Sequence, residues 1–358
     1  MNTGPIILLG SGETSPSIRK VYDWLFRQLE IPTRVSILET PAGFEPNSDY
    51  VAGQIGTYLE KRLQNYHPQV SILPARKRGT ELSPDNPAIL QPLYDANAIF
   101  MGPGSPTYAA RQLNDSLAYH MLRTCNRMGT AIVFASATSL ACSQKVMPIY
   151  EIYKVGEELH WKEGLDFFGD YGLSLIFVPH WNNNDGGKEL DTSRCYIGQD
   201  RFHRLLDILP DKETAEYTVV GIDENTALII DPDEELCRVM GPGGVTIVRE
   251  LAGNVNEQVF AAGSTFSCQE LGPFQIPNAQ TGIPADVWSD TVARMADAAE
   301  ERARKPKPSD EIMALVRERT EMRERKEWQQ ADVLRAQIEA AGWQVMDTPQ
   351  GPVVVARE

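Results

Sequence analysis

The chain has 358 residues, of which 42% are hydrophobic and 8% aromatic. This is enough for about two domains and a buried core, which excludes wholesale disorder. The net charge of −15, from 34 Lys and Arg against 49 Asp and Glu, argues against a general binder of phosphate backbones, because so acidic a body repels them at long range. The five cysteines are scattered without a CxxC pair, which indicates a reduced, cytoplasmic protein with no disulfide framework or zinc site.

The N-terminal stretch MNTGPIILLGSGETS has no basic region, and its apolar run ends at a glycine turn. We therefore expect a first β-strand there rather than a signal peptide. No apolar run approaches the length of about 18 residues that a membrane span needs, so no membrane partner is expected. The sequence GSGETS at residues 10–15 lacks the last glycine of GxGxxG, so a dinucleotide site is not expected either.

Short apolar runs alternate with amphipathic stretches over the first half of the chain. The runs are PIILLG, RVSILET, QVSILPA, AIFMGP, AIVFAS and SLIFVPH. Continuously apolar strands suit a parallel sheet that is covered on both faces. Helix-like segments lie between them, and two of these, SPSIRKVYDWLFRQL and SPTYAARQL, open with a Ser-Pro capping signal. The alternation predicts a three-layer α/β domain with a mainly parallel sheet.

The pattern changes in the second half of the chain. YTVVGIDENTALIID, CRVMGPGGVTIVRE and the segment around NEQVFAAGSTFSC predict antiparallel strands added to one edge of the sheet. We assign residues 1–270 to this domain. Residues 271–308 are rich in Pro and Ala and are predicted to be a linker. Residues 309–358 are predicted to form a small α+β module, with two charged helices, a stop at Gly342 and two short strands around DTPQG.

Four strand ends carry residues suited to catalysis, because reactive groups in an open parallel sheet gather there. Gly104 in GPGSP lies where a backbone N–H can face a developing negative charge, although a plain turn has the same composition. Ser136 follows a strand and is either an exposed nucleophile or a helix cap. His180 closes another strand and is either a general base or a structural polar residue. Of the adjacent Asp223 and Glu224, one is expected to turn inward and orient a histidine, unless both are solvated.

The order of glycine turn, serine, histidine and acid resembles that of the serine peptidase family of peptidase E and cyanophycinase, which has the class I glutamine amidotransferase-like fold. The resemblance covers about residues 5–250. VVGIDENTALIID resembles the strand that carries the family's acidic residue, and VPHW resembles the strand that ends in its histidine. IFMGPGSPTYAARQL resembles the family's oxyanion turn, and GTAIVFASATSLA resembles its nucleophile segment. The resemblance implies a Ser136, His180 and Glu224 triad, an oxyanion hole at the N–H groups of Gly104 and Ala137, and neither a cofactor nor a metal.

The nucleophile segment departs from the family pattern at two positions. Phe134 and Thr138 stand where the family has glycine, and their bulk predicts a turn wider than in active relatives. Ser139, with alanine two residues to either side, is therefore a second candidate nucleophile. Cys142 lies beyond the turn and is expected to serve packing. A hydrogen bond between Ser136 and His180 would support catalysis, whereas a longer separation would support a binding module.

The end of the chain has a second resemblance. LVRERTEMRERKEWQQADVLRAQIEAAGWQVMDTPQG resembles the small C-terminal domain of cysteinyl-tRNA synthetases, in which it helps to hold the anticodon end of tRNA. The synthetase signatures HIGH and KMSKS are absent, so aminoacylation is excluded. Arg319, Arg323 and Lys326 fall on one helix face and are the candidate contacts for RNA. Acidic residues interleave with them, so docking of a protein partner, or simple packing, is favoured over tRNA.

The leading functional hypothesis is a serine hydrolase that cleaves a small peptide or amide substrate through an acyl-enzyme. The alternative is a non-catalytic, amidotransferase-like binding module whose tail docks tRNA or a protein. The sequence specifies neither the substrate nor the oligomeric state, for which a homodimer is one alternative.

Overall fold

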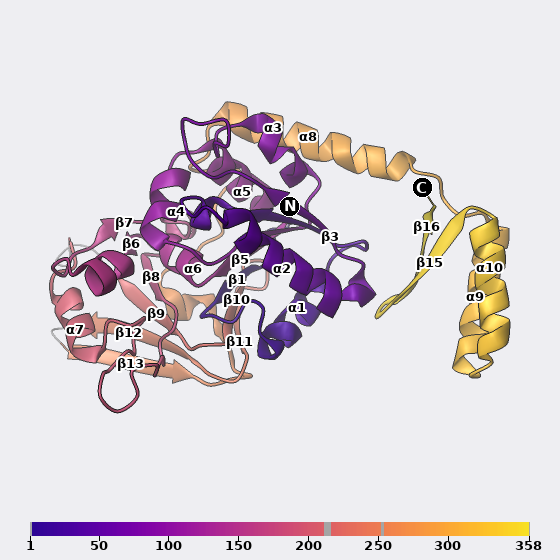
Figure 1. The fold of residues 1–358 in the computed structure, drawn as a ribbon. Helices are drawn as coiled ribbons and strands as arrows, with labels where there is room; N and C mark the ends of the chain where they lie inside the picture. The colour runs from indigo at the N-terminus through magenta and orange to yellow at the C-terminus, as the bar shows by residue number, and fades with distance from the viewer. Residues whose placement is uncertain (1, 211–215, 252–253, 358) are drawn as a thin grey trace.

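The computed structural model describes residues 2–210, 216–251 and 254–357. They form two larger β-sheets and two two-stranded ones, with surrounding helices and a C-terminal pair of helices (Figure 1). The α-helices are α1 Arg19–Phe26, α2 Ser48–Arg62, α3 Pro87–Leu90, α4 Pro106–Leu113, α5 Leu117–Arg127, α6 Ala137–Ala141, α7 Gln199–Asp207, α8 Ala285–Arg304, α9 Asp310–Glu324 and α10 Trp328–Ala340. The strands are β1 Ile6–Leu9, β2 Arg34–Leu38, β3 Gln69–Leu73, β4 Ala98–Met101, β5 Ala131–Ala135, β6 Lys145–Val146, β7 Lys162–Glu163, β8 Leu175–Val178, β9 Thr218–Ile222, β10 Ala227–Asp231, β11 Leu236–Met240, β12 Val245–Leu251, β13 Asn254–Phe260, β14 Thr265–Ser267, β15 Trp343–Thr348 and β16 Gly351–Ala356.

The larger sheet has eight strands in the order β14-β11-β10-β1-β5-β4-β2-β3. The five strands from β1 to β3 in this order are parallel, and β10, β11 and β14 add to them in antiparallel fashion. Strands β1, β4 and β5 are completely buried, as their unbroken apolar runs predict for a sheet that is covered on both faces. The expected α/β fold with a mainly parallel sheet is therefore confirmed.

Helices cover both faces of this sheet. Helices α1 and α2 place their apolar sides on one face, where Val21, Leu25 and Leu59 belong to one core cluster. Helices α4 and α5 lie on the other face, where Leu113 and Met121 belong to a second cluster. The amphipathic spacing in the sequence therefore corresponds to real buried stripes.

A second sheet of four strands, in the order β13-β12-β9-β8, packs against the same second cluster. This corrects two expectations. Strand β8, predicted in the main sheet, instead pairs in parallel with β9, and the antiparallel strands are divided between the two sheets rather than added to one edge. Hydropathy identifies a strand but not its partner, because every buried strand presents the same apolar pattern.

The segment predicted to be a linker contains a long helix. Helix α8 packs against α5, and Val287 and Met295 contact the second core cluster. Its last turn also contacts the body, where the Arg302 guanidinium donates to the Asp95 carboxylate. The segment is therefore tied to the body through one side of α8, while most of its side chains are exposed.

The C-terminal module is an antiparallel pair of helices, α9 and α10, against the β15–β16 hairpin. Its core consists of Ile312, Val316, Ile338 and Val345. Gly342 has a φ of 84°, the left-handed conformation that commonly ends a helix. The two helices, the glycine stop and the hairpin are all as predicted.

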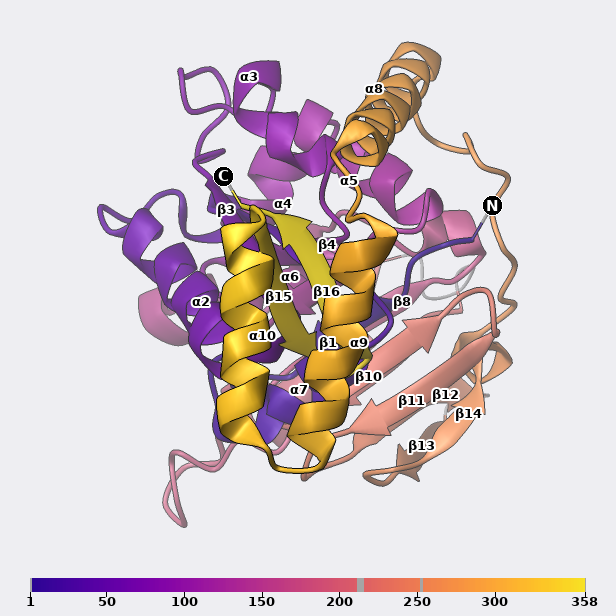
Figure 2. The same ribbon diagram turned by 90° about the vertical axis from the view of Figure 1, so that its right-hand side faces the viewer.

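The module meets the body through its hairpin. In the view turned by 90°, β15 and β16 lie behind helices α9 and α10 (Figure 2). Strand β15 lies close to the short helix Gln64–Tyr66. Gln350, in the hairpin turn, donates to the Arg27 carbonyl oxygen at 2.9 Å. Of all the helices in the described ranges, none combines the length and apolar character that crossing a bilayer requires.

Candidate active site

The candidate site forms where the two sheets converge, at the carboxyl ends of β1, β5, β8 and β9. Two backbone hydrogen bonds join these ends: His180 N–H donates to Gly10 O at 3.1 Å, and Trp181 N–H donates to Ile222 O at 3.1 Å. Ser136 follows β5, His180 follows β8, and Glu224 follows β9. The convergence brings together three residues that are far apart in the sequence.

Ser136 lies at the sharp turn between β5 and α6. Its φ of 53° and ψ of −106° are rare for a residue with a side chain and expose the hydroxyl at the top of the sheet. The turn is held by the Ser136 N–H, which donates to Leu9 O at 3.1 Å. The Ser136 Oγ lies 2.9 Å from His180 Nε2, within hydrogen-bond distance.

His180 connects the serine to the carboxylate. Its Nδ1 lies 2.8 Å from Glu224 Oε1, so the two ring nitrogens face the hydroxyl and the acid respectively. This arrangement suits a ring that donates from Nδ1 and accepts at Nε2. The Tyr196 ring packs beside the imidazole, with centroids 5.5 Å apart. The histidine is therefore oriented from three sides.

Glu224 is held by the loop that follows His180. Asn183 Nδ2 donates to the same Oε1 atom at 2.9 Å, and Asn182 Oδ1 accepts from the Glu224 N–H at 2.8 Å. The hydrogen bond from His180 lowers the pKa of Glu224, with a further contribution from Asn183, against the opposing effect of burial. The carboxyl group is consequently ionised at neutral pH.

The neighbouring Asp223 points elsewhere. Its Oδ2 accepts from the Gly244 N–H at 2.8 Å, and burial raises the pKa of its carboxyl group. Both carboxylates lie in the connection between β9 and β10 and not within a continuous strand, and of the two it is Glu224 that contacts His180.

The turn with Gly104 leads into helix α4. Gly104 has a φ of +148°, and a Cβ atom there would lie 2.0 Å from the Pro41 carbonyl oxygen, so only glycine fits. The Ser105 N–H donates to that oxygen at 3.0 Å and fixes the turn. Among the described residues, the N–H groups of Gly104 and Ala137 donate to no other protein atom. Both are free to bind a substrate oxygen.

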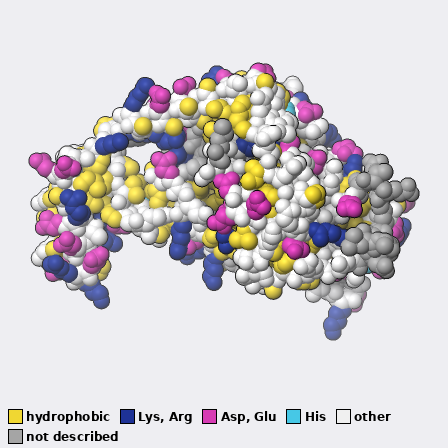
Figure 3. Space-filling view, turned by 180° about the vertical axis from the view of Figure 1, so that it is seen from behind, with side chains coloured by type: hydrophobic (Ala, Val, Ile, Leu, Met, Phe, Trp, Pro, Cys, Tyr) yellow, Lys and Arg dark blue, Asp and Glu magenta, His cyan; other side chains and the backbone are white. Residues whose placement is uncertain are grey.

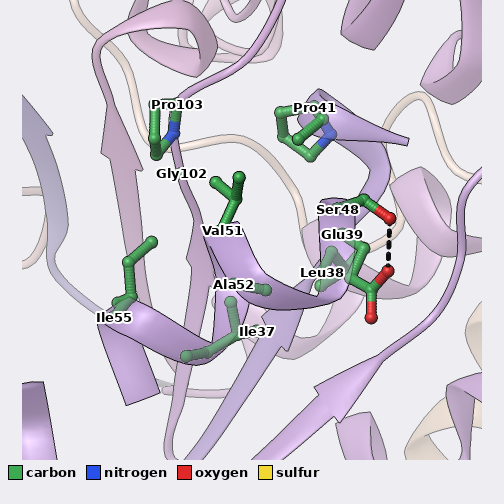
Figure 4. A pocket seen from close by; sticks show the side chains of 11 residues that line it. Ile37, Leu38, Glu39, Pro41, Ser48, Val51, Ala52, Ile55, Gly102 and Pro103 are labelled. Carbon is green, nitrogen blue, oxygen red and sulfur yellow. Dashed lines mark hydrogen bonds between the residues drawn. The ribbon is translucent and has the colours of Figure 1, made fainter. Parts of the chain in front are cut away.

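A small, mostly apolar pocket lies beside this turn, and the side chains that line it pack against the turn (Figure 4). Ile55 and Val51 of α2 lie under Gly102 and Pro103. A Cβ atom on Gly102 would come within 2.6 Å of the Ile55 side chain. At the far end of the pocket, Ser48 donates to the buried Glu39 carboxylate at 2.9 Å. The turn is therefore packed against side chains of helix α2.

The two departures from the family pattern are accommodated in the core. Phe134 is completely buried and packs edge-on against Phe167, with centroids 5.1 Å apart. Thr138 is buried and turns its hydroxyl toward the end of β4. The side chains at both positions point away from Ser136 Oγ, which keeps its contact with His180.

The second candidate nucleophile lies elsewhere. The Ser139 hydroxyl is buried and is within 3.0 Å of Leu9 O and 3.1 Å of Phe134 O, both backbone acceptors. Its hydroxyl therefore holds the turn together rather than facing His180. Cys142 is buried at the end of α6, in keeping with a packing role.

Unusual backbone conformations gather around this site. Ser136, His180 and Asn225 all have positive φ values. So do the three consecutive residues 194–196, with φ of 59°, 60° and 66°. The Cys195 N–H in this left-handed turn donates to His180 O at 3.2 Å. Strain of this kind persists only where the surrounding structure imposes it, and it concentrates at functional sites.

The arrangement places the Ser136 hydroxyl against a histidine that Glu224 orients, which is what activation of the hydroxyl requires. Within the described portion of the chain, no group of three or more His, Cys, Asp or Glu residues is placed to hold a metal ion. The sequence pointed to Ser136, His180, Glu224, Gly104 and Ala137. It missed the two supporting asparagines and Tyr196, for which the only signal was the polar run WNNND after the histidine strand.

The tail residues proposed for RNA contact do not form one exposed face. Arg319 is only 2% exposed, and its guanidinium makes two hydrogen bonds to the Asp347 carboxylate, at 2.7 and 2.8 Å. Arg323 also approaches Asp347, at 3.3 Å, and stacks over Trp328. Of the three predicted residues, Lys326 alone is exposed and forms no ion pair with another residue that the structure describes. Helical periodicity placed the three side chains on one face, but Arg319 is buried against Asp347 of the hairpin while Arg323 and Lys326 stay exposed.

Comparison with known proteins agrees with both resemblances. The crystal structure of a peptidase from an acI-B1 Actinobacterium matches with a TM-score of 0.57 and 24% identity, over 74% of this chain and 97% of that one. A crystal structure of a candidate peptidase E from Listeria monocytogenes EGD-e matches with a TM-score of 0.42 and 13% identity, over 72% of this chain and 100% of that one.

The tail matches a different family. Residues 305–352 match the model of the cysteinyl-tRNA ligase anticodon binding domain. The search of curated proteins found no match. The chain therefore has a fold similar to that of a peptidase, followed by a segment similar to an anticodon-binding domain.

Proposed function

We propose that the chain is a serine hydrolase that cleaves an amide or peptide bond in a small substrate. The observation that carries the proposal is the continuous chain of contacts from Ser136 Oγ to His180 Nε2, at 2.9 Å, and from His180 Nδ1 to Glu224 Oε1, at 2.8 Å. The strained turn at Ser136 supports it further, because an exposed nucleophile on such a turn is typical of hydrolases with this type of sheet.

In the proposed reaction, Ser136 Oγ attacks the substrate carbonyl carbon while its proton moves to His180 Nε2. The tetrahedral oxyanion is bound by the N–H groups of Gly104 and Ala137. The carbon–nitrogen bond then breaks, and the amine leaves with the proton from His180. Water, deprotonated by the same histidine, releases the acid from the acyl-enzyme. Glu224 stays ionised and stabilises the imidazolium that forms.

A fluorophosphonate tests this proposal directly. It forms an Oγ–P bond with an activated serine and expels fluoride, so the intact mass should rise by one phosphonyl group on the wild-type chain. Peptide mapping should locate the label on Ser136, and Ser136→Ala and His180→Ala should each abolish labelling. Ser139→Ala is the matched control and should label. A wild-type chain that takes up no label would overturn the proposal in favour of the binding-module alternative.

We further propose that residues 309–358 form a separate docking module for a macromolecule, with a protein partner favoured over tRNA. The family-model match supports such a role. Lys and Arg side chains are interspersed with Asp and Glu over this region (Figure 3), so phosphate attraction is weakened. The ion pair with Asp347 and the burial of Arg319 remove one of the three candidate phosphate contacts.

A gel-shift assay of the full chain with bulk tRNA at low salt distinguishes the two partners. The expected result is no shift, or a weak shift that Lys326→Glu leaves unchanged. A shift that Lys326→Glu and Arg317→Glu each weaken, and that added salt abolishes, would establish tRNA as the partner instead.

We propose a cytoplasmic location for the enzyme. The five cysteines are free and buried, and Cys237 Sγ and Cys268 Sγ lie 3.7 Å apart without a bond. Cysteines that form no disulfide framework are typical of a reducing compartment. Mass analysis of the protein alkylated directly from its source cells should find all five thiols reduced, and a Cys237–Cys268 disulfide would contradict the location.

A further inference from the structure

Thr138 bridges two strands beside the candidate site. Its buried Oγ1 accepts from the Ala135 N–H at 2.9 Å. Of the backbone oxygens within reach of its proton, the Met101 carbonyl oxygen is nearest at 2.6 Å, ahead of Ala135 O at 3.1 Å and Gly102 O at 3.4 Å. Ala135 ends β5 and Met101 ends β4, so the hydroxyl stands between the two strands where their pairing stops. This side chain occupies a position at which the family resembled in sequence has glycine.

The two strand ends held by this hydroxyl lead to the two free N–H groups. Met101 lies three residues before Gly104, and Ala135 lies two residues before Ala137. The pairing of β4 with β5 ends at Met101 and Phe134. Beyond that point the Pro41 oxygen holds the Gly104 turn, and Leu9 O holds the Ser136 turn. The Thr138 hydroxyl links the two turns to each other directly.

We propose that Thr138 is a positioning residue that sets the separation of the Gly104 and Ala137 N–H groups, so that both reach the same substrate oxygen. This inference rests on the proposed hydrolase function. The catalytic value of an oxyanion hole depends on donors that are in place before charge develops, and a displacement of about 1 Å costs a large part of the rate. A hydroxyl that accepts from one strand and donates to the other fixes their spacing in a way that glycine cannot.

The test compares fluorophosphonate labelling rates of the full-length wild type, Thr138→Ser and Thr138→Val. Valine keeps the shape of threonine but leaves Ala135 N–H and Met101 O unpaired. We expect Thr138→Val to lower the maximal labelling rate by about 10- to 100-fold at unchanged probe affinity, because the probe's P=O oxygen occupies the oxyanion hole. Thr138→Ser keeps the hydroxyl and should label within about threefold of wild type.

Thr124→Val is the matched control. Thr124 is equally buried, and its hydroxyl also donates to a backbone oxygen, His120 O at 2.9 Å, but within helix α5. It should label at the wild-type rate. Circular dichroism verifies folding, and Thr138→Ala replaces the valine variant if that variant does not fold.

Several outcomes overturn the inference. Equal rates for Thr138→Val and wild type would do so, as would a Thr138→Ser protein as slow as Thr138→Val, or a loss confined to probe affinity. An unlabelled wild type would instead defeat the hydrolase proposal itself, and this inference with it.

Discussion

Ser136 and His180 share one support, the end of strand β1. Ser136 N–H donates to Leu9 O, and His180 N–H donates to Gly10 O. Both residues have a positive φ, a conformation that costs about 1–3 kcal/mol for each residue with a side chain. The two turns are therefore anchored to consecutive residues, Leu9 at the end of β1 and Gly10 directly after it.

Replacement of Glu224 tests the orientation of His180. Glu224→Gln removes the negative charge that faces His180 Nδ1, and we expect the rate of fluorophosphonate labelling to fall by about 10²- to 10⁴-fold. Asp223→Asn is the control, since that adjacent carboxylate bonds to Gly244 N–H instead. Equal rates for the two variants would refute the orienting role of Glu224.

The same carboxylate makes stability depend on pH. The pKa of Glu224 is lowered in the folded chain, mainly by the hydrogen bond from His180, so its contribution to stability is present above the ordinary glutamate value. The contribution is lost as pH falls from that value through the lowered one. Urea unfolding of wild type and Glu224→Gln should therefore differ at pH 7 and converge in acid. A difference that grows on acidification would contradict this sign.

The β5–α6 turn is stabilised from the core side. Phe134 is completely buried between the sheet and Phe167, so Phe134→Ala should lower the free energy of unfolding by about 3–5 kcal/mol. Phe44→Ala, at a side chain that is 51% exposed, should cost about 0.5 kcal/mol or less. Urea titration of both variants measures the contrast, and similar midpoints would show that Phe134 is not a core residue.

The Arg319–Asp347 pair joins the α9 helix to the hairpin. Arg319→Met removes two charge-assisted hydrogen bonds, and we expect the module to lose about 2 kcal/mol of local stability. This loss of stability is moderate because the Asp347 carboxylate is 46% exposed and can be hydrated once the arginine is removed. Arg317→Met, at an exposed position, is the control. Hydrogen exchange in residues 310–324 and 343–348 should quicken only in the first variant, and unchanged protection there would contradict the prediction.

At the scale of the whole molecule, the sequence predicted the α/β class, the strand segments and the tail hairpin, because hydropathy period and glycine stops are local signals. It did not predict that β8 and β9 form a second sheet, nor that α8 packs on α5. Strand pairing and helix docking depend on surfaces brought together from distant parts of the chain, and local patterns do not encode them.

For the candidate site too, some features follow from the sequence and others only from the tertiary structure. The sequence by itself determined which residues stand at strand ends, including Ser136, His180 and Glu224, because a change from apolar to polar residues marks each end. Only the tertiary structure decided that the three form a contact chain, that Ser139 and Arg319 are buried, and that Thr138 bridges two strands. The physical reason is that a side chain's role depends on the acceptor it reaches, and here each acceptor comes from a remote strand.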